Sequence, residues 1–167
     1  QAEIKQLIQK QRTFFHSDAT LDVEYRIHAL QKLKACILKY ENEINIAIRA
    51  DLGKCAFESY MCETGLVLSE LTYMLKHTRK FSKERTVRTP LAQFHSRSYQ
   101  KPSPYGVTLI MSPWNYPVML TIEPLIDALA AGNTAILKPS AYSAHTTALI
   151  SRMIQECFDE KYVAVVT

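Results

Sequence analysis

Apolar residues recur every three or four positions through the first 81 residues of the chain, which is the spacing of amphipathic helices. One helix is predicted over 4–15, before the polar run 16–18. A second pattern covers 21–52, with a break near 41–43 and a left-handed stop at Gly53. The amino-terminal half is therefore predicted to be helical.

A third helix is predicted over 57–81. Its apolar stripe is typical of a packing face, because Tyr and Met residues at helical spacing belong to the core far more often than to a site. The residues assigned to this inner face are Phe57, Tyr60, Met61, Thr64, Leu68, Leu71 and Leu75.

The helical spacing ends near residue 85. Residues 86–90 and 94–99 are predicted to form two polar extended segments, which Pro90 and the pair Pro102 and Pro104 interrupt. A polar ribbon has no apolar face to bury, so we expect it to pair with another part of the protein. The alternative is a mobile surface loop.

A strand, a helix and a second strand follow in close succession. Residues 107–111 are apolar and β-branched, which predicts a fully buried strand of a parallel sheet. Thr121 is the expected cap of the helix, Pro124 is tolerated in its first turn, and Gly132 with Asn133 ends it. Thr134 begins the second strand, which completes a β-α-β unit.

A further helix and strand are predicted in the last part of the chain. Ser140 or Ser143 is the expected helix cap, and 162–166 begin an apolar strand. The apolar side of the helix is assigned to Ala148, Leu149, Met153, Ile154 and Cys157. Because the chain stops inside a strand, before any turn or return helix, we expect it to be part of a longer protein.

Composition narrows the function classes. The 20 basic and 16 acidic residues are spread along the chain, so solubility explains the excess of positive charge better than a nucleic-acid partner does. No apolar run reaches the roughly 18 to 20 residues of a membrane helix, and the first residues do not form a signal sequence. A cytoplasmic location is the default expectation.

Four cysteines occur in the chain, and they show neither the paired spacing of metal ligands nor the density of a disulfide scaffold. They are Cys36, Cys55, Cys62 and Cys157. We interpret them as small buried hydrophobic residues in a reducing compartment, and we expect no metal site.

Two polar clusters lie at the ends of the predicted strands: PWNYP at 113–117 and KPS at 138–140. With the intervening LTIEPLIDALAAGN, they resemble the cofactor domain of the aldehyde dehydrogenases, and most closely the class 3 branch. DLGK at 51–54, the helix over 57–81 and YGV from Tyr105 resemble the same branch. The resemblance covers most of the chain.

The resemblance implies an α/β fold with a parallel, Rossmann-like sheet that the chain contains only in part. Residues 1–84 would be the amino-terminal helical part of the cofactor domain, and 85–105 an extended bridging segment. Residues 106–167 would begin the NAD(P)-binding β-α-β region. In the family, the bridging segment belongs to an oligomer-forming sheet that later sequence completes, so a homodimer is expected.

The resemblance also assigns chemistry to the first cluster. The asparagine of PWNYP donates its side-chain amide to the oxyanion in the family, and here it is Asn115. Taken alone, Asn115 would be a turn residue between Trp114 and Tyr116. Tyr116 is assigned to the substrate passage, although both aromatic residues could instead close the turn by packing.

The second cluster is assigned to the cofactor. Lys138 matches the lysine that hydrogen-bonds the adenosine ribose, and Ser140, Pro113 and Trp114 complete the expected cofactor-binding set. The family's usual KPSE would place a carboxylate on the ribose hydroxyls, but position 141 is Ala. A carboxylate there would repel the 2′-phosphate of NADP, so its absence favours NADP, or both NADP and NAD, over strict use of NAD.

The function hypothesis is the amino-terminal portion of an NAD(P)-dependent aldehyde dehydrogenase, which oxidises an aldehyde to a carboxylic acid through a cysteine thioester. The nucleophile and the base belong to later sequence, and none of the four cysteines sits in a matching context, so the chain alone is expected to be inactive. One alternative is a non-catalytic nucleotide-binding or interaction module. Another is a helical scaffold in which the PWNYP turn is only structural.

Overall fold

The structure is a computed structural model that describes residues 2–167. Its helices are α1 (Ala2–Phe15), α2 (Val23–Lys39), α3 (Glu41–Leu52), α4 (Ala56–Ser59), α5 (Gly65–Phe81), α6 (Met119–Ala131) and α7 (Ala144–Cys157). Single 3₁₀ turns lie at Ala19–Leu21 and Leu91–Gln93, and a π-helical turn lies at Tyr60–Thr64. The strands are β1 (Arg85–Val87), β2 (Ser98–Gln100), β3 (Val107–Met111), β4 (Thr134–Lys138) and β5 (Val163–Val165).

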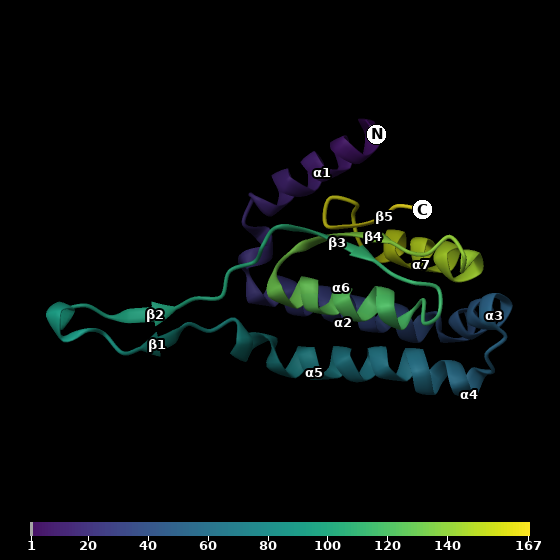
Figure 1. Ribbon diagram of the computed structural model, residues 1–167, viewed down its shortest axis with the longest axis horizontal. Helices are drawn as coiled ribbons and strands as arrows, with labels where there is room; N and C mark the ends of the chain where they lie inside the picture. The colour runs from purple at the N-terminus through teal and green to yellow at the C-terminus, as the bar shows by residue number, and fades with distance from the viewer. Residues whose placement is uncertain (1) are drawn as a thin grey trace.

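A parallel sheet in the order β3-β4-β5 lies between helices (Figure 1). Helix α1 contacts β3 and β4 on one face of the sheet, and α6 contacts them on the other face. Helix α2 packs against α6, and α5 contacts both of these helices. Helix α7 packs on β5 and supports α3. The α/β class with a parallel sheet is therefore confirmed.

The predicted β-α-β unit is confirmed as β3-α6-β4. Its strands run parallel with Val107 opposite Thr134. Gly132 ends α6 with a φ of 93°, a left-handed conformation that favours glycine. The backbone N–H of Asn133 donates to Ala128 O at 2.9 Å, and the side-chain Oδ1 of Asn133 accepts from the Gly106 N–H at 2.9 Å. The turn at Gly132 and Asn133 therefore positions β4 next to β3.

The expectation of a fully buried strand at 107–111 is wrong. Leu109 and Met111 are 61% and 74% exposed, while four of the five residues of β4 are buried. Strand β3 is at the edge of the sheet within residues 2–167, so burial falls on the central strand, β4. The exposed side chains of β3 line a hollow of about 430 Å³ together with Ile4 and Ile8 of α1.

The inner face predicted for a helix over 57–81 is also wrong in its first turns. Three elements replace the single helix, namely α4, the π-helical turn and α5. Phe57, Tyr60 and Met61 are exposed, whereas Leu71 and Thr64 are buried as expected. A π-helical turn holds one more residue than an α-helical turn, so it shifts which side chains face inward.

Neither expected serine or threonine cap caps its helix. Helix α6 begins at Met119, so Thr121 lies inside its first turn and Pro124 in its second. Ser143 is the residue before α7, but neither its hydroxyl oxygen nor that of Ser140 accepts a hydrogen bond from the free N–H groups of that helix. Carboxylates from distant elements do so instead, as described below.

Buried side chains of α2, α6 and β4 form the centre of the core. Those with almost no exposure include Leu30, Leu33, Ile37, Ile122, Leu125, Ile126, Leu129 and Leu137. Arg26 is a buried charge at the edge of this core: Nε donates to Thr20 O at 2.6 Å and Nη2 to Leu21 O at 3.2 Å. Burial lowers the pKa of its guanidinium, and a Cβ at Gly132 would lie 2.7 Å from its Cζ.

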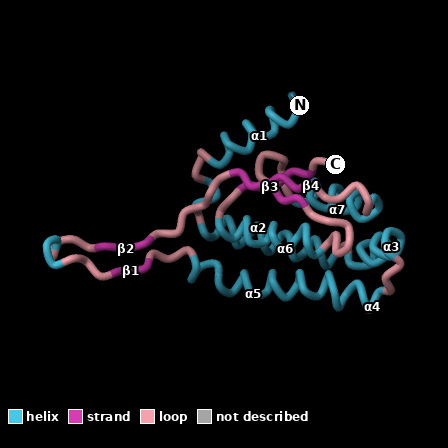
Figure 2. Tube along the Cα trace, viewed as in Figure 1, coloured by secondary structure: helices cyan, strands magenta, loops and turns pink. Residues whose placement is uncertain are grey.

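The segment between α5 and β3 is a hairpin that projects from the body (Figures 1 and 2). Strands β1 and β2 pair antiparallel, with Arg85 opposite Gln100 and Val87 opposite Ser98. The polar ribbon thus pairs with itself, and the helical turn Leu91–Gln93 connects its strands. Its side chains are largely exposed.

The cysteines are all unpaired in the described range. Cys36 and Cys157 are buried as expected. Cys55, the residue before α4, is exposed, and Cys62, in the π-helical turn, is partly exposed. Within residues 2–167, no helix is long and apolar enough to cross a membrane.

Candidate functional site

Two loops meet at the carboxyl edge of the parallel sheet. The first, 112–117, follows β3, and the second, 138–140, begins at the last residue of β4. The strand register places Met111 opposite Lys138, and the Ser112 N–H donates to Lys138 O at 3.2 Å. The structure therefore brings together the two clusters that the sequence singled out, at the edge where open α/β sheets bind ligands.

Asn115 lies on the outer side of the first loop. Its side chain is exposed, as are those of Trp114 and Tyr116, and within residues 2–167 its carboxamide makes no hydrogen bond. Its backbone carbonyl accepts a hydrogen bond from Lys54 Nζ at 2.9 Å. The amide group of Asn115 is therefore available to a bound molecule, while its backbone is held.

A buried ion pair lies beneath this loop. Lys54 Nζ is 2.7 Å from Glu63 Oε1, and the two side chains are 11% and 0% exposed. Glu63 Oε2 accepts from the Val118 N–H at 2.9 Å and from the Met119 N–H at 3.4 Å. These are N–H groups at the start of α6, so Glu63 is the cap of that helix in place of Thr121.

The π-helical turn is what points Glu63 inward. The Gly65 N–H bonds to Tyr60 O, five residues back, and a Cβ on Gly65 would lie 2.7 Å from that same oxygen. Glycine therefore permits this close approach of backbone to backbone. Sequence reasoning missed Glu63, because an acidic residue in an amphipathic pattern is normally assigned to the solvent side of a helix.

Hydroxyl groups close the base of the first loop. The Thr121 hydroxyl donates to Pro117 O at 2.6 Å, and the Ser112 and Thr121 hydroxyls lie 2.6 Å apart, both buried. Thr121 thus ties the loop to α6 from inside the helix. The loop that carries Asn115 is held from below and from both ends.

The second loop carries the predicted cofactor residues. Lys138 is half-buried, and its Nζ donates to Pro139 O at 3.0 Å. Ser140 Oγ accepts from the Tyr142 N–H at 3.2 Å. Ala141 is exposed, so the space that a carboxylate would occupy in KPSE is open to solvent. A lysine ammonium and a serine hydroxyl are suitable partners for ribose hydroxyl or phosphate oxygens.

Asp51 fixes the helix that follows the second loop. Its Oδ2 accepts from the Thr146 N–H and hydroxyl, both at 2.7 Å, and its Oδ1 accepts from the His145 N–H at 3.1 Å and Nδ1 at 2.8 Å. Burial raises the pKa of Asp51, but these hydrogen bonds outweigh burial and leave the pKa below its usual range. Asp51 replaces Ser140 and Ser143 as the cap of α7.

The stretch 51–54 therefore supports both loops. Asp51 holds the start of α7, which follows the second loop, and Lys54 holds the backbone of Asn115 in the first loop. Its resemblance to the DLGK of a known family was the only signal that could have drawn attention to these two residues. Gly53, with a φ of 71°, ends α3 and lets the chain turn between them.

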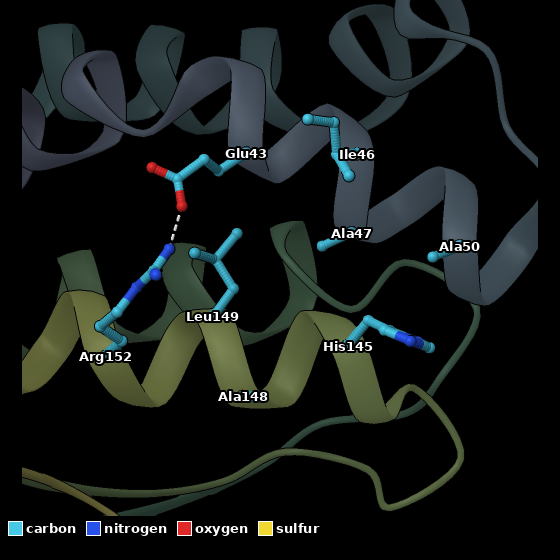
Figure 3. Close-up of a pocket in the computed structure, with 8 residues that line it drawn as sticks. All are labelled: Glu43, Ile46, Ala47, Ala50, His145, Ala148, Leu149 and Arg152. Atoms are coloured by element: carbon cyan, nitrogen blue, oxygen red, sulfur yellow. Dashed lines mark hydrogen bonds and ion pairs between the residues drawn. The ribbon is translucent and has the colours of Figure 1, made fainter.

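Lys138 also lies at the margin of the hollow between α1 and the sheet. Another hollow, of about 540 Å³, lies elsewhere, between α3 and α7 (Figure 3). An ion pair between Glu43 and Arg152 spans it at one end, and Ala47 and Ala50 form part of its wall. None of the predicted site residues lines it.

Comparison with known proteins agrees with the motifs. The sequence model of the aldehyde dehydrogenase family matches residues 1–167. The chain is 41% identical to a 4,4'-diaponeurosporen-aldehyde dehydrogenase of Staphylococcus aureus, over 98% of this chain and 36% of that protein. It is 33% identical to a dimeric, NADP-preferring aldehyde dehydrogenase of Canis lupus familiaris, over 99% of this chain and 37% of that protein. Other relatives carry the name aldehyde dehydrogenase family 3.

Solved structures give the same answer for the fold. A structure of the substrate-bound state of Staphylococcus aureus AldH superposes with a TM-score of 0.95 at 41% identity, over 98% of this chain and 36% of that one. The chain thus spans about a third of the length of the relatives that it matches, and it corresponds to their amino-terminal part.

Proposed function

The chain belongs to the aldehyde dehydrogenase family, and on that premise we propose that the enzyme carrying it oxidises an aldehyde to a carboxylic acid with NADP or NAD. The nucleophilic cysteine and the base of this reaction lie outside the chain, so residues 1–167 by themselves are expected to be inactive. The observation that carries the proposal is Asn115, exposed on a loop that a buried ion pair holds.

Attack of a thiolate on an aldehyde places a negative charge on the former carbonyl oxygen. In the proposal, the Asn115 carboxamide donates a hydrogen bond to that oxygen. A neutral amide needs no proton transfer before it donates, and a fixed backbone removes the cost of reorienting it as the charge develops. Trp114 and Tyr116, exposed beside Asn115, are assigned to the cofactor site and the substrate passage, respectively.

Lys138 and Ser140 are the proposed contacts to the adenosine ribose of the cofactor, with Pro113 and Trp114 nearby on the first loop. When bound, the nicotinamide accepts the hydride that leaves the substrate. The donor set fits such a ligand, since within residues 2–167 the Lys138 ammonium bonds only to the adjacent Pro139 carbonyl and retains further donors.

We propose that NADP is used at least as well as NAD. Ala141 is exposed and presents no carboxylate to the 2′-phosphate. The name of the canine relative, which describes an NADP-preferring enzyme, supports this assignment. Measured dissociation constants that favour NAD strongly over NADP would contradict it.

The proposed assembly is a homodimer that uses the bridging segment 85–105. The support is the projecting hairpin, whose short strands pair only with each other in the described chain. The canine relative is named as dimeric. A cytoplasmic location is proposed on the basis of the four unpaired cysteines, since cytosolic thiols stay reduced.

The test of the proposed reaction is Asn115→Ala in the full-length enzyme. Loss of one oxyanion donor lowers kcat by about 100- to 1000-fold, or about 3 to 4 kcal/mol of barrier. The assay follows the formation of NAD(P)H by its absorbance. Asn42→Ala, an exposed asparagine on α3, is the matched control and should keep wild-type kcat. An Asn115→Ala enzyme with undiminished kcat would refute the assignment.

A further inference from the structure

We propose that Lys54 and Glu63 are positioning residues, which hold the Asn115 loop in the orientation needed for oxyanion binding. This inference rests on the proposed function of Asn115 and adds two residues that act through it. Glu63 is fully buried and Lys54 is 11% exposed, and both spend their polar atoms on each other and on the backbone of residues 115, 118 and 119, so we assign neither to substrate contact.

The Lys54 ammonium makes three contacts in this region. It donates to Glu63 Oε1 at 2.7 Å and to Asn115 O at 2.9 Å, and it lies 4.0 Å from the centre of the Tyr116 ring. A buried ammonium with two charge-assisted or polar acceptors and an aromatic face has little freedom to move. Lys54 therefore fixes the peptide group that follows Asn115.

Glu63 holds the other side of the same loop. Its Oε2 accepts the N–H groups of Val118 and Met119 while its Oε1 accepts from Lys54. The ion pair thus contacts the backbone both at residue 115 and at residues 118 and 119. The segment between these contacts is short, so the pair sets the direction of the chain through the turn.

The Asn115 side chain has no support of its own. Within the described range its carboxamide makes no hydrogen bond, so its position follows from the backbone that carries it. A donor that must meet a developing charge loses much of its effect when it is displaced by about 1 Å, which can cost on the order of 100-fold in rate. Release of the Asn115 carbonyl should therefore slow catalysis even though Lys54 never contacts the substrate.

The experiment is a double-mutant cycle in the full-length enzyme with Lys54→Met and Asn115→Ala. The readout is the single-turnover rate of NAD(P)H formation with enzyme in saturating excess over aldehyde, because that rate does not depend on the fraction of active molecules. Lys54→Met should lower the rate by about 10- to 100-fold. In the Asn115→Ala background it should lower the rate no further, because the group through which it acts is gone.

Two further variants separate positioning from general stability. Arg26→Met removes another buried cation that binds backbone carbonyls, at the end of α6 opposite the loop. It should lower the melting temperature while leaving the single-turnover rate unchanged. Lys54→Arg keeps a cation near Glu63 and should recover part of the rate lost in Lys54→Met. Should Lys54→Met fold poorly, Glu63→Gln, which keeps the shape of the side chain, takes its place in the cycle.

The possible outcomes are distinguishable. If Asn115→Ala does not change the rate, the proposed function fails. If Asn115→Ala slows the reaction but Lys54→Met and Glu63→Gln do not, or if their effects multiply with that of Asn115→Ala, the positioning role is overturned and the function stands. A rate that falls only in the presence of Asn115 supports the inference.

Discussion

Replacement of Gly65 by alanine tests whether the π-helical turn is required. Gly65 has an ordinary helical φ of −65°, so helix propensity alone predicts that Gly65→Ala stabilises the protein by about 1 kcal/mol. The structure predicts the opposite sign. The added Cβ would lie 2.7 Å from Tyr60 O and 3.1 Å from Tyr60 Cε1, and the first of these atoms is backbone that cannot swing away.

The magnitude follows from what the turn holds in place. If Tyr60 O moves, the π-helical turn opens and Glu63 is drawn away from Lys54 and from the Val118 N–H. Breaking a buried ion pair costs about 3 to 5 kcal/mol. After subtraction of the gain in helix propensity, Gly65→Ala should destabilise the protein by about 2 to 4 kcal/mol.

The assay is urea and thermal unfolding of the full-length enzyme, followed by circular dichroism under one set of conditions, with Gly53→Ala as the matched control. Gly53 has a φ of 71° and nothing within 4 Å of an added Cβ, so its replacement has only the backbone cost of about 1 kcal/mol. Gly65→Ala should be the more destabilising of the two and should also lower kcat. A neutral or stabilising Gly65→Ala would refute the reasoning.

Two further predictions concern the second loop. Asp51→Ala removes the cap of α7 and should lower the free energy of unfolding at pH 7 by about 1 to 2 kcal/mol. Because the pKa of Asp51 is held below its usual value, this contribution is present above the unfolded-state pKa of about 4 and is lost as the pH falls through the folded-state pKa. Unfolding curves of both proteins from pH 7 to pH 3 check this, and a difference that vanishes well above pH 5 would contradict it. Ala141→Glu should weaken NADP binding by at least about 10-fold while leaving NAD binding similar or tighter, since a carboxylate repels the 2′-phosphate. Fluorescence titration of both cofactors measures the ratio, with Ala141→Gln as the uncharged control, and an unchanged NADP to NAD ratio would contradict the prediction.

The spacing of apolar residues along the chain correctly located most of the helices and strands. Helical spacing located α1, α2 and α3, and the apolar runs located β3 and β4. Gly53 and Gly132 end their helices in the left-handed conformation, as their position after an apolar repeat indicates. These features depend on residues within a few positions of each other, so a single sequence contains the information needed.

Local pattern was a poor guide wherever a distant residue intervened. Thr121 looked like a cap, but Glu63, 55 residues before Val118, accepts from the N–H groups at the start of α6. Asp51 likewise takes the place of Ser143 as the cap of α7, through a bond to Thr146, 95 residues later. The periodicity over 57–81 also could not reveal a π-helical turn, because the turn depends on a close approach at Gly65 rather than on hydrophobic spacing.

The amino-acid sequence by itself determined the α/β class, the β-α-β unit and the family, because these follow from periodicity and from the joint spacing of PWNYP and KPS. Its resemblance to the family also pointed to Asn115 and Lys138, whose loops follow adjacent predicted strands. Only the tertiary structure decided how the Asn115 loop is held. A buried carboxylate and ammonium become partners only when folding removes them from water and brings α3, the π-helical turn and α6 together, and no local pattern records that meeting.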